Sequence, residues 1–305
     1  MKNILLVFIG CSLISLVNAQ TLAEKLGYKN TDRLLIINCD DAGMCNAANI
    51  AALEGQKKGL ITSATIMIPC PKSDEMISLA KNNSLDVGIH LTHTAEWKKY
   101  RWGSIANSEK VKGLLDSEGY LWRNIEEVYE HSNPLEAYYE GKAQIQKALD
   151  SGLEITHIDS HMGTLQLSPP YVDVYLQLAT EFNLPVRMAS QETLELYGQP
   201  YIRKKFKDRG ILFTDYFIYE ELDNYTEDDI KTFWTGIIQN LKPGITELFI
   251  HASAPDQELK KITDSWKTRN TEYELFTNDE EFVELLKQEE IILIGYKPIL
   301  DFQRK

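Results

Sequence analysis

The chain has 305 residues, of which 43% are hydrophobic, 10% aromatic and 25% charged, a composition that excludes collagen-like and largely disordered proteins. It carries 32 Lys and Arg against 45 Asp and Glu, which gives a formal net charge of −13. Because nucleic acids and anionic membranes attract basic proteins, this charge argues against both as partners. The length can bury the core of one large α/β domain or of two smaller ones.

The first nineteen residues are typical of a secretory signal peptide. Lys2 precedes an apolar run over 4–17, and the small residue Ala19 suits a cleavage site. The run is too short for a transmembrane helix, which needs about 20 apolar residues. We therefore expect an exported protein, periplasmic or secreted, that is not an integral membrane protein. The alternatives to this signal peptide are a lipoprotein cut before Cys11 and a cytoplasmic protein with an apolar N terminus. Residues 20–32 are polar, and we expect them to form a lead-in to the domain.

From residue 33 onward, short apolar runs alternate with helical patterns. The run at Arg33–Cys39 has the continuous apolar character of a strand that is buried on both faces. Similar runs recur at 61–68, 86–91, 155–159, 184–188, 211–213, 246–250 and 291–294. Apolar residues at helical spacing predict helices from Ser168 to Phe182 and from Ile230 to Leu241. This alternation predicts a mostly parallel sheet, and seven or eight strands favour a barrel over a doubly wound open sheet.

Residues 92–133 interrupt the alternation with an aromatic-rich stretch that has no clear period. Long insertions in compact domains are usually lids or binding loops, and aromatic rings can stack on the faces of sugars. We expect Trp97 and Trp102 to contact substrate. The alternative is that these aromatic side chains only pack the insertion against the protein. The region 33–305 is predicted to form a single domain that contains this insertion.

Ionisable residues follow several of the predicted strands. Asp40 and Asp41 end the first strand, His90 ends the third, and His161 and His251 end two later ones. Because parallel α/β barrels build their active sites at the C-terminal ends of their strands, these side chains are expected to converge. Adjacent carboxylates repel each other, and a divalent cation would remove that cost. A helix-capping role is the alternative for the aspartates.

His157, Asp159 and His161 alternate along one predicted strand. Side chains two positions apart share one face of an extended chain, so three ionisable groups would lie on the same face. A metal-bound imidazole with a carboxylate hydrogen-bonded behind it explains such a pattern, with Asp159 as the supporting carboxylate. A solvated strand edge is the alternative.

Asp41, His90 and His161 together form a set of one carboxylate and two histidines. Those ligands suit Zn²⁺, whereas Mg²⁺ would usually require more oxygen ligands. A metal with an open position lowers the pKa of bound water to about 7 and polarises a carbonyl group. Asp40 could take the proton from that water, and His251 could protonate a leaving nitrogen or stabilise the oxyanion. The set predicts hydrolysis of an amide or an ester.

Four motifs, three of which contain these residues, are LLIINCDDAG at 34–43, GLITSAT at 59–65, VGIHL at 87–91 and THIDSH at 156–161. Together they resemble the signatures of the YdjC-like carbohydrate deacetylases, and the similarity extends from about residue 33 to the C terminus. The resemblance implies a modified (β/α) barrel related to polysaccharide deacetylases. It also implies one divalent metal ion and the removal of N-acetyl groups from amino sugars or oligosaccharides.

By matching position, the resemblance implies that Asp41, His90 and His161 bind the metal and that Asp40 is the base. Members of the family are commonly described with Mg²⁺, so the metal stays open between Zn²⁺ and Mg²⁺. The acetylated amino sugar or oligosaccharide is the expected partner. The oligomeric state is not given by the sequence, and a homodimer is one option.

Two further positions match the family and two depart from it. Arg187 resembles a basic residue that steadies the aspartates, with a surface salt bridge as the alternative, and His251 matches a histidine near the C terminus. Gly163 stands where a second histidine is frequent, and Ala42 where phenylalanine is usual. No expected metal ligand is lost, so we expect the chemistry to be retained and the pocket to be altered.

Two rival functions share parts of this pattern. A non-haem Fe(II) oxygenase also uses two histidines and one carboxylate, but such enzymes generally have a cupin-type β fold, which the alternation of strands and helices disfavours. A catalytically silent carbohydrate-binding barrel would keep the fold and the aromatic insertion, but the intact ionisable set argues against it.

Overall fold

The computed structural model describes residues 20–58, 60–220, 222 and 225–305. The signal peptide predicted at 1–19 lies outside these residues. In the described chain, seven parallel strands form one sheet in the order β4-β3-β2-β1-β6-β5, with β7 paired to β1. The strands are β1 Arg33–Ala42, β2 Ser63–Ile66, β3 Val87–Leu91, β4 Ile158–Ser160, β5 Tyr216–Ile218, β6 Gly244–Ile250 and β7 Ile291–Leu293.

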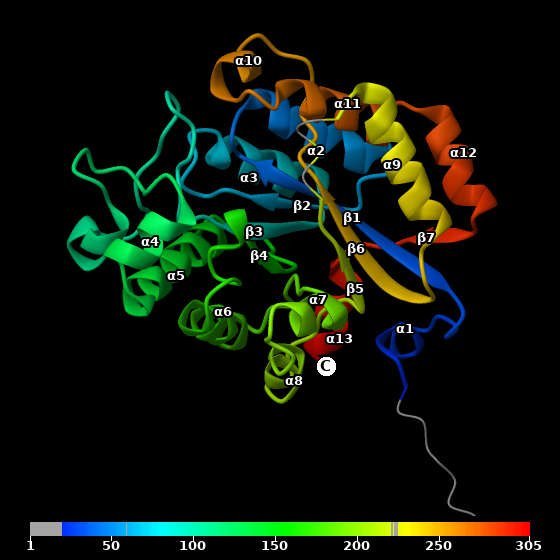
Figure 1. The fold of residues 1–305 in the computed structure, drawn as a ribbon, viewed down its shortest axis with the longest axis horizontal. Coiled ribbons are helices and arrows are strands. Elements are labelled where there is room, and N and C mark those ends of the chain that lie inside the picture. The colour runs from blue at the N-terminus through cyan, green and yellow to red at the C-terminus, as the bar shows by residue number, and fades with distance from the viewer. Residues whose placement is uncertain (1–19, 59, 221, 223–224) are drawn as a thin grey trace, which may run out of the picture.

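Helices surround the sheet (Figure 1). They are α1 Leu22–Lys25, α2 Asn46–Lys58, α3 Ser73–Asn83, α4 Ile125–His131, α5 Pro134–Asp150, α6 Pro169–Phe182, α7 Gln191–Leu196, α8 Ile202–Lys207, α9 Glu227–Gln239, α10 Leu259–Ile262, α11 Trp266–Thr277, α12 Glu280–Gln288 and α13 Lys297–Gln303. The two helices expected from apolar spacing are α6 and α9. Helix α6 begins with two prolines after Ser168, where a missing N–H costs no intrahelical bond.

The sheet curls into a partial barrel, which confirms the predicted α/β barrel class. The gap between β4 and β5 is bridged by isolated contacts. Ile158 N donates to Pro185 O at 3.0 Å and Arg187 N donates to Ile158 O at 3.1 Å, which forms one parallel bridge, and Val186 N donates to Leu212 O at 3.1 Å. The expected strands at 184–188 and 211–213 therefore do not form regular ladders. Pro185 has no N–H to donate, which helps to explain why the ladder is interrupted there.

The two faces of β1 have different neighbours. Leu34 and Ile36 lie in a small apolar cluster with residues of α1 and α13, including Ile299, which closes the N-terminal end of the barrel. Because side chains alternate along a strand, Asn38 and Asp40 continue the same face toward the C-terminal end. The barrel interior thus changes from apolar to polar along β1, and the polar part leads to the candidate site.

The aromatic insertion at 92–133 is an ordered segment that contains α4 and packs on α5. The buried carboxylate of Glu140 accepts hydrogen bonds from Ile105 N at 3.0 Å and Ala106 N at 2.9 Å. Glu136 accepts one from Gly113 N at 2.8 Å. Two carboxylates of α5 therefore satisfy backbone donors of the insertion and hold it beside the barrel.

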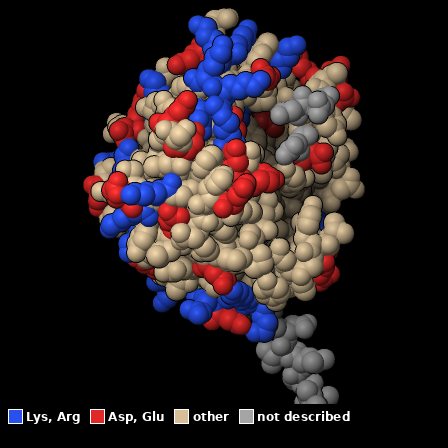
Figure 2. Space-filling model, turned by 60° about the vertical axis from the view of Figure 1, so that its left-hand side comes forward, with Lys and Arg blue, Asp and Glu red and all other residues tan. Residues whose placement is uncertain are grey.

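The surface mixes acidic and basic side chains, with Lys and Arg gathered at the top of the face in Figure 2. Helix α10, which carries Lys260 and Lys261, lies at that end of the molecule in Figure 1. Within the described residues, none of the helices is both long and apolar enough to cross a membrane.

Candidate metal centre

A bulge at the end of β1 brings two neighbouring carboxylates to the same place. The pairing with β2 shifts register between Cys39 and Ala42, and Asp41 has a φ of 62°, in the left-handed region. In a regular strand, adjacent side chains point to opposite faces. Here both carboxylates approach His90 Nε2, with Asp40 Oδ2 at 3.9 Å and Asp41 Oδ1 at 3.5 Å. The bulge redirects one side chain toward the site.

Three potential ligand atoms form a nearly equilateral triangle. Asp41 Oδ1 lies 3.5 Å from His90 Nε2 and 3.5 Å from His161 Nδ1, and the two nitrogens are 3.2 Å apart. Dividing the mean side of about 3.4 Å by √3 places a point about 2 Å from all three atoms, the usual bond length for Zn²⁺ or Mg²⁺. Asp41 Oδ1 is buried and has no hydrogen-bond partner in the described chain. These residues fit a divalent cation.

His90 is oriented by Asp159, which pairs with it across β3 and β4. His90 Nδ1 lies 2.6 Å from Asp159 Oδ1, while Asp159 Oδ2 accepts a hydrogen bond from Thr65 Oγ1 at 2.9 Å. A proton on Nδ1 leaves the lone pair of Nε2 facing the triangle. This is the supporting carboxylate that the alternating pattern predicts.

All three members of the alternating set are buried, so they do not form a solvated strand edge. His157 belongs to neither group of possible ligands in the described chain, and its ring stacks on Tyr296 at a centroid distance of 3.7 Å. A Cβ atom at Gly88 would lie 2.7 Å from the ring of His157, so glycine makes room for it. His157 therefore packs the barrel interior, while Asp159 and His161 belong to the site.

Asp40 is bound by Arg187, as expected from the sequence. Arg187 donates from Nη1 to Asp40 Oδ2 at 2.6 Å and from Nη2 to Oδ1 at 2.7 Å. Its Nε donates to Glu247 Oε1 at 2.7 Å, and Glu247 also accepts from Tyr296 Oη. Burial opposes the ionisation of Asp40, but the guanidinium outweighs it and holds the pKa of Asp40 at about 2. Asp40 is ionised throughout the physiological range.

A second group of three possible ligands consists of Asp40, His90 and Asp159. Both carboxylates of this group already accept hydrogen bonds or ion pairs from Arg187, and Asp159 also contacts the Nδ1 of His90. The group containing Asp41 and His161 is therefore the one that leaves ligand atoms available.

His251 follows β6, which pairs with β1 so that Ile250 lies opposite Cys39. Its ring contacts Phe249 edge-on at a centroid distance of 5.2 Å. Burial lowers the pKa of His251, and the nearby carboxylate of Asp41 only partly opposes this effect. The imidazole is therefore neutral at pH 7.

The two tryptophans expected to contact substrate have different surroundings. Trp97 is half-buried, and its ring lies 6.4 Å from that of His161. Trp102 is only 3% exposed and packs against Trp97 and Tyr100, at 5.3 Å and 6.3 Å between ring centroids. Trp97 lies beside the site, whereas Trp102 supports the insertion from within.

Two residues of the site were not anticipated from the sequence. Glu96 Oε2 lies 3.0 Å from His161 Nε2. Arg269 of α11 donates from Nη2 to Asp41 Oδ2 at 2.7 Å. Glu96 follows the strand-end residue His90 by six positions, which is a weak signal, and nothing in the sequence of α11 marks Arg269.

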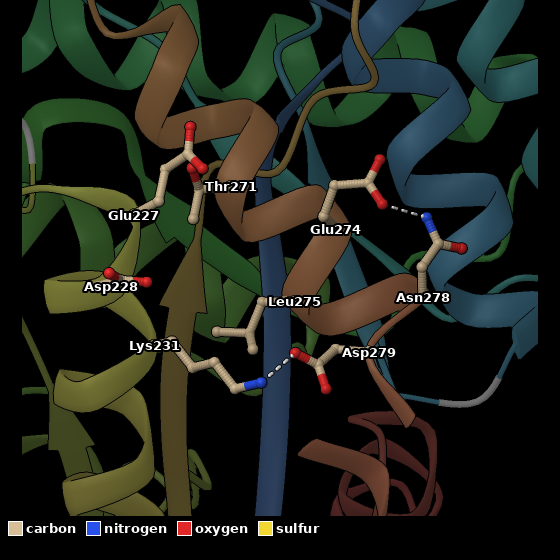
Figure 3. A pocket seen from close by; sticks show the side chains of 8 residues that line it. All are labelled: Glu227, Asp228, Lys231, Thr271, Glu274, Leu275, Asn278 and Asp279. Atoms are coloured by element: carbon tan, nitrogen blue, oxygen red, sulfur yellow. Dashed lines mark hydrogen bonds and ion pairs between the residues drawn. The ribbon is translucent and has the colours of Figure 1, made fainter. Parts of the chain in front are cut away.

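A surface pocket of about 340 Å³ lies between α9 and α11, away from the barrel interior (Figure 3). Lys231 donates to Asp279 at 2.7 Å, and Asn278 donates to Glu274 at 2.8 Å. Four of the lining residues form these two pairs, and none of the residues expected to act in catalysis lines the pocket.

The fold and the cluster define an α/β barrel protein with a candidate divalent-metal centre at the C-terminal edge of its strands. The family model of YdjC-like proteins matches residues 34–288, and the chain belongs to this family. The resemblance found in the four sequence motifs is confirmed.

Known relatives cover most of the chain. A carbohydrate deacetylase of Thermoanaerobacter pseudethanolicus is 28% identical over 87% of this chain and 98% of its own. One of Thermus thermophilus is 31% identical over 83% of this chain and 89% of its own. A crystal structure from Enterococcus faecalis, described as a candidate cellobiose-phosphate cleavage protein, has a TM-score of 0.74 at 26% identity. It matches 88% of this chain and 99% of its own length.

Proposed function

We propose that this protein is a metal-dependent carbohydrate deacetylase that hydrolyses the N-acetyl groups of amino sugars or oligosaccharides. The observation that carries the proposal is the triangle of Asp41, His90 and His161, which lies beside the ionised pair of Asp40 and Arg187. The names of the relatives support the acetylated carbohydrate as the substrate class.

The side chains around the triangle have distinct proposed roles. A bound Zn²⁺ or Mg²⁺ would polarise the acetyl carbonyl and lower the pKa of a coordinated water. Asp40 would accept the proton of that water, because Arg187 keeps it ionised and fixes its orientation. Asp159 would hold His90 in the tautomer that binds the cation.

His251 has two candidate roles, and its lowered pKa favours one of them. A neutral imidazole is too weak an acid to protonate a leaving amine, but its N–H can donate a hydrogen bond to a developing oxyanion. We therefore assign His251 to the stabilisation of the tetrahedral intermediate. Trp97 is the side chain that we assign to stacking on the sugar ring, because it is half-buried beside His161.

The test is the release of acetate from N-acetylglucosamine oligosaccharides by protein that has been loaded with Zn²⁺ or Mg²⁺. We expect release by the wild type and a loss of at least about 10³-fold for His161→Ala, since a lost metal ligand removes several kcal/mol of transition-state stabilisation. Equal rates for wild type and variant would contradict the proposal. Calorimetric sugar binding without acetate release would instead favour a catalytically silent barrel.

Export is a separate proposal that rests on the sequence of residues 1–19 alone. We propose that the mature protein begins at Gln20 and acts in the periplasm or outside the cell. N-terminal sequencing of protein recovered from the cell envelope and from the medium tests this. An intact Met1 on cytoplasmic protein would contradict it.

A further inference from the structure

Glu96 contacts the outer nitrogen of a candidate metal ligand. Its Oε2 lies 3.0 Å from His161 Nε2, while His161 Nδ1 faces Asp41 and His90 at 3.5 Å and 3.2 Å. The side chain of Glu96 is 21% exposed and that of His161 is 5% exposed, so little water competes for this contact. Glu96 contacts the nitrogen of His161 that faces away from the triangle, just as Asp159 contacts the outer nitrogen of His90.

Of the two neutral tautomers of the His161 ring, this contact selects one. A neutral histidine carries a proton on one nitrogen and a lone pair on the other. If the proton were on Nδ1, the lone pair of Nε2 would face the carboxylate of Glu96 and repel it. With the proton on Nε2, the ring donates a hydrogen bond to Glu96 and presents the lone pair of Nδ1 to the triangle. A carboxylate in this position also raises the basicity of the ligand nitrogen.

The backbone around Glu96 belongs to the aromatic insertion. The N–H of its neighbour Ala95 donates to Trp122 O at 2.7 Å, which ties this stretch to a later part of the insertion. The next residue, Trp97, lies under the guanidinium of Arg269 at 5.8 Å, and Arg269 binds Asp41. Glu96 therefore contacts one candidate ligand directly, and Trp97 contacts the arginine that binds another.

We infer that Glu96 is a positioning residue that fixes His161 for metal binding and links occupation of the metal site to the order of residues 93–102. The inference rests on the metal site of the proposed function but not on the hydrolytic reaction. Because coupling between two equilibria is reciprocal, a cation that orders His161 also stabilises the contact with Glu96, and loss of that contact weakens binding of the cation.

The first experiment titrates the full chain with Zn²⁺ alone and measures affinity by calorimetry or by competition with a chromogenic chelator. We expect Glu96→Gln to bind about 10–100-fold more weakly than the wild type, since outer partners of ligating histidines typically contribute this much. Glu96→Ala should lose at least as much. The matched control is Glu109→Gln, because Glu109 lies in the same insertion, is 75% exposed and pairs with Lys112 at 2.8 Å; its affinity should remain within twofold of the wild type.

The second experiment measures hydrogen exchange of residues 93–102 with and without Zn²⁺. We expect the cation to slow exchange there in the wild type and in Glu109→Gln, and to have a much smaller effect in Glu96→Ala. Unchanged affinity in both Glu96 variants, or exchange in the wild type that does not respond to the cation, would overturn the inference.

The two proposals fail in different ways. Tight metal binding that depends on Glu96, without acetate release by any loaded sample, would refute the deacetylase activity and leave this inference standing. A wild type that binds neither Zn²⁺ nor Mg²⁺ at millimolar concentration would refute both.

Discussion

Asp40 and Arg187 are joined by two parallel hydrogen bonds of 2.6 Å and 2.7 Å inside the barrel, although 147 positions separate them in the sequence. Such a bidentate pair fixes the plane of the carboxylate as well as its charge. Glu247 binds the remaining edge of the guanidinium, so the orientation of Asp40 depends on a chain of buried contacts that crosses from β1 to β6.

Replacing Arg187 with Met should move the acid limb of the pH–rate profile to higher pH. In the wild type the pKa of Asp40 is about 2, so this carboxylate stays ionised and doesn't limit activity at pH 4 or above. Without the guanidinium, burial loses its main opponent and raises the pKa of Asp40 against the weaker effect of His90 and His251, so the variant becomes protonated and inactive on the acid side. Arg187→Lys keeps the positive charge and should shift the acid limb of the profile less. An acid limb at the same pH in Arg187→Met would show that Asp40 is not the proton acceptor.

Asp41→Asn should lower both metal affinity and stability. The variant loses the charged ligand and leaves Arg269 buried without its carboxylate, which typically costs about 3–5 kcal/mol when one partner of a buried pair is removed. Urea denaturation and metal titration measure the two effects. Asp74→Asn is the control, because the side chain of Asp74 is 78% exposed and pairs with Lys147 on the surface. Equal stability and equal metal affinity of the two variants would contradict the assignment of Asp41 to the metal site.

Removal of the metal by a chelator should lower the melting temperature, and Zn²⁺ or Mg²⁺ should restore it. A ligand that binds only the folded state stabilises it by about 2.7 kcal/mol at a concentration of 100 Kd. The same additions should leave the melting temperature of His161→Ala almost unchanged. A shift of equal size in that variant would place the bound cation elsewhere in the protein.

Acid should destabilise the fold partly through His93. Burial lowers the pKa of His93 to about 4, and its Nε2–H donates to Ala137 O at 3.0 Å. The unfolded chain has the ordinary pKa near 6.5 and binds the proton first, so stability falls as the pH decreases from about 6.5 to 4. The loss from this group is about 3 kcal/mol between pH 7 and pH 4. His93→Gln should lose correspondingly less stability over this range in urea denaturation, and an identical loss would contradict the prediction.

Trp97→Ala should affect substrate binding, whereas Trp102→Ala should affect the stability of the fold. Trp97 is half-buried beside His161, so its loss should mainly raise the KM for oligosaccharides. Trp102 is 3% exposed, and truncation of a buried tryptophan typically costs about 3–5 kcal/mol of stability. Steady-state kinetics and urea denaturation separate the two effects. A KM that changes only in Trp102→Ala would reverse the assignment.

The sequence predicts the convergence of His90, His161 and the aspartates, because parallel strands bring their C-terminal ends to one edge. The alternation at 157–161 also marks Asp159 as a supporting carboxylate, and the pairing of β3 with β4 places it behind His90. Other parts depend on contacts that have no local pattern. Arg269 comes from a helix whose buried face carries no recognisable motif, and Glu96 from a segment without periodicity.

No residue pattern in the sequence predicts the backbone conformation at Asp41. The left-handed φ of Asp41 is costly for a residue with a side chain, and only the surrounding bulge and the bond to Arg269 show why it is retained. The apolar run at 184–188 predicts a regular strand. The residues are buried as expected, but Pro185 has no N–H to donate and a continuous ladder does not form.

The bond between Arg269 and Asp41 joins positions 228 residues apart and has a consequence for the order of folding. Contacts between such distant segments form late, because the loop between them must close first. The N-terminal half can therefore assemble β1 to β4 before α11 docks, but in that state the carboxylate of Asp41 has no guanidinium to hold it. Because Asp41, His90 and His161 all belong to this first half, a cation would bind there before α11 docks and would hold the strand ends together while the rest of the barrel forms.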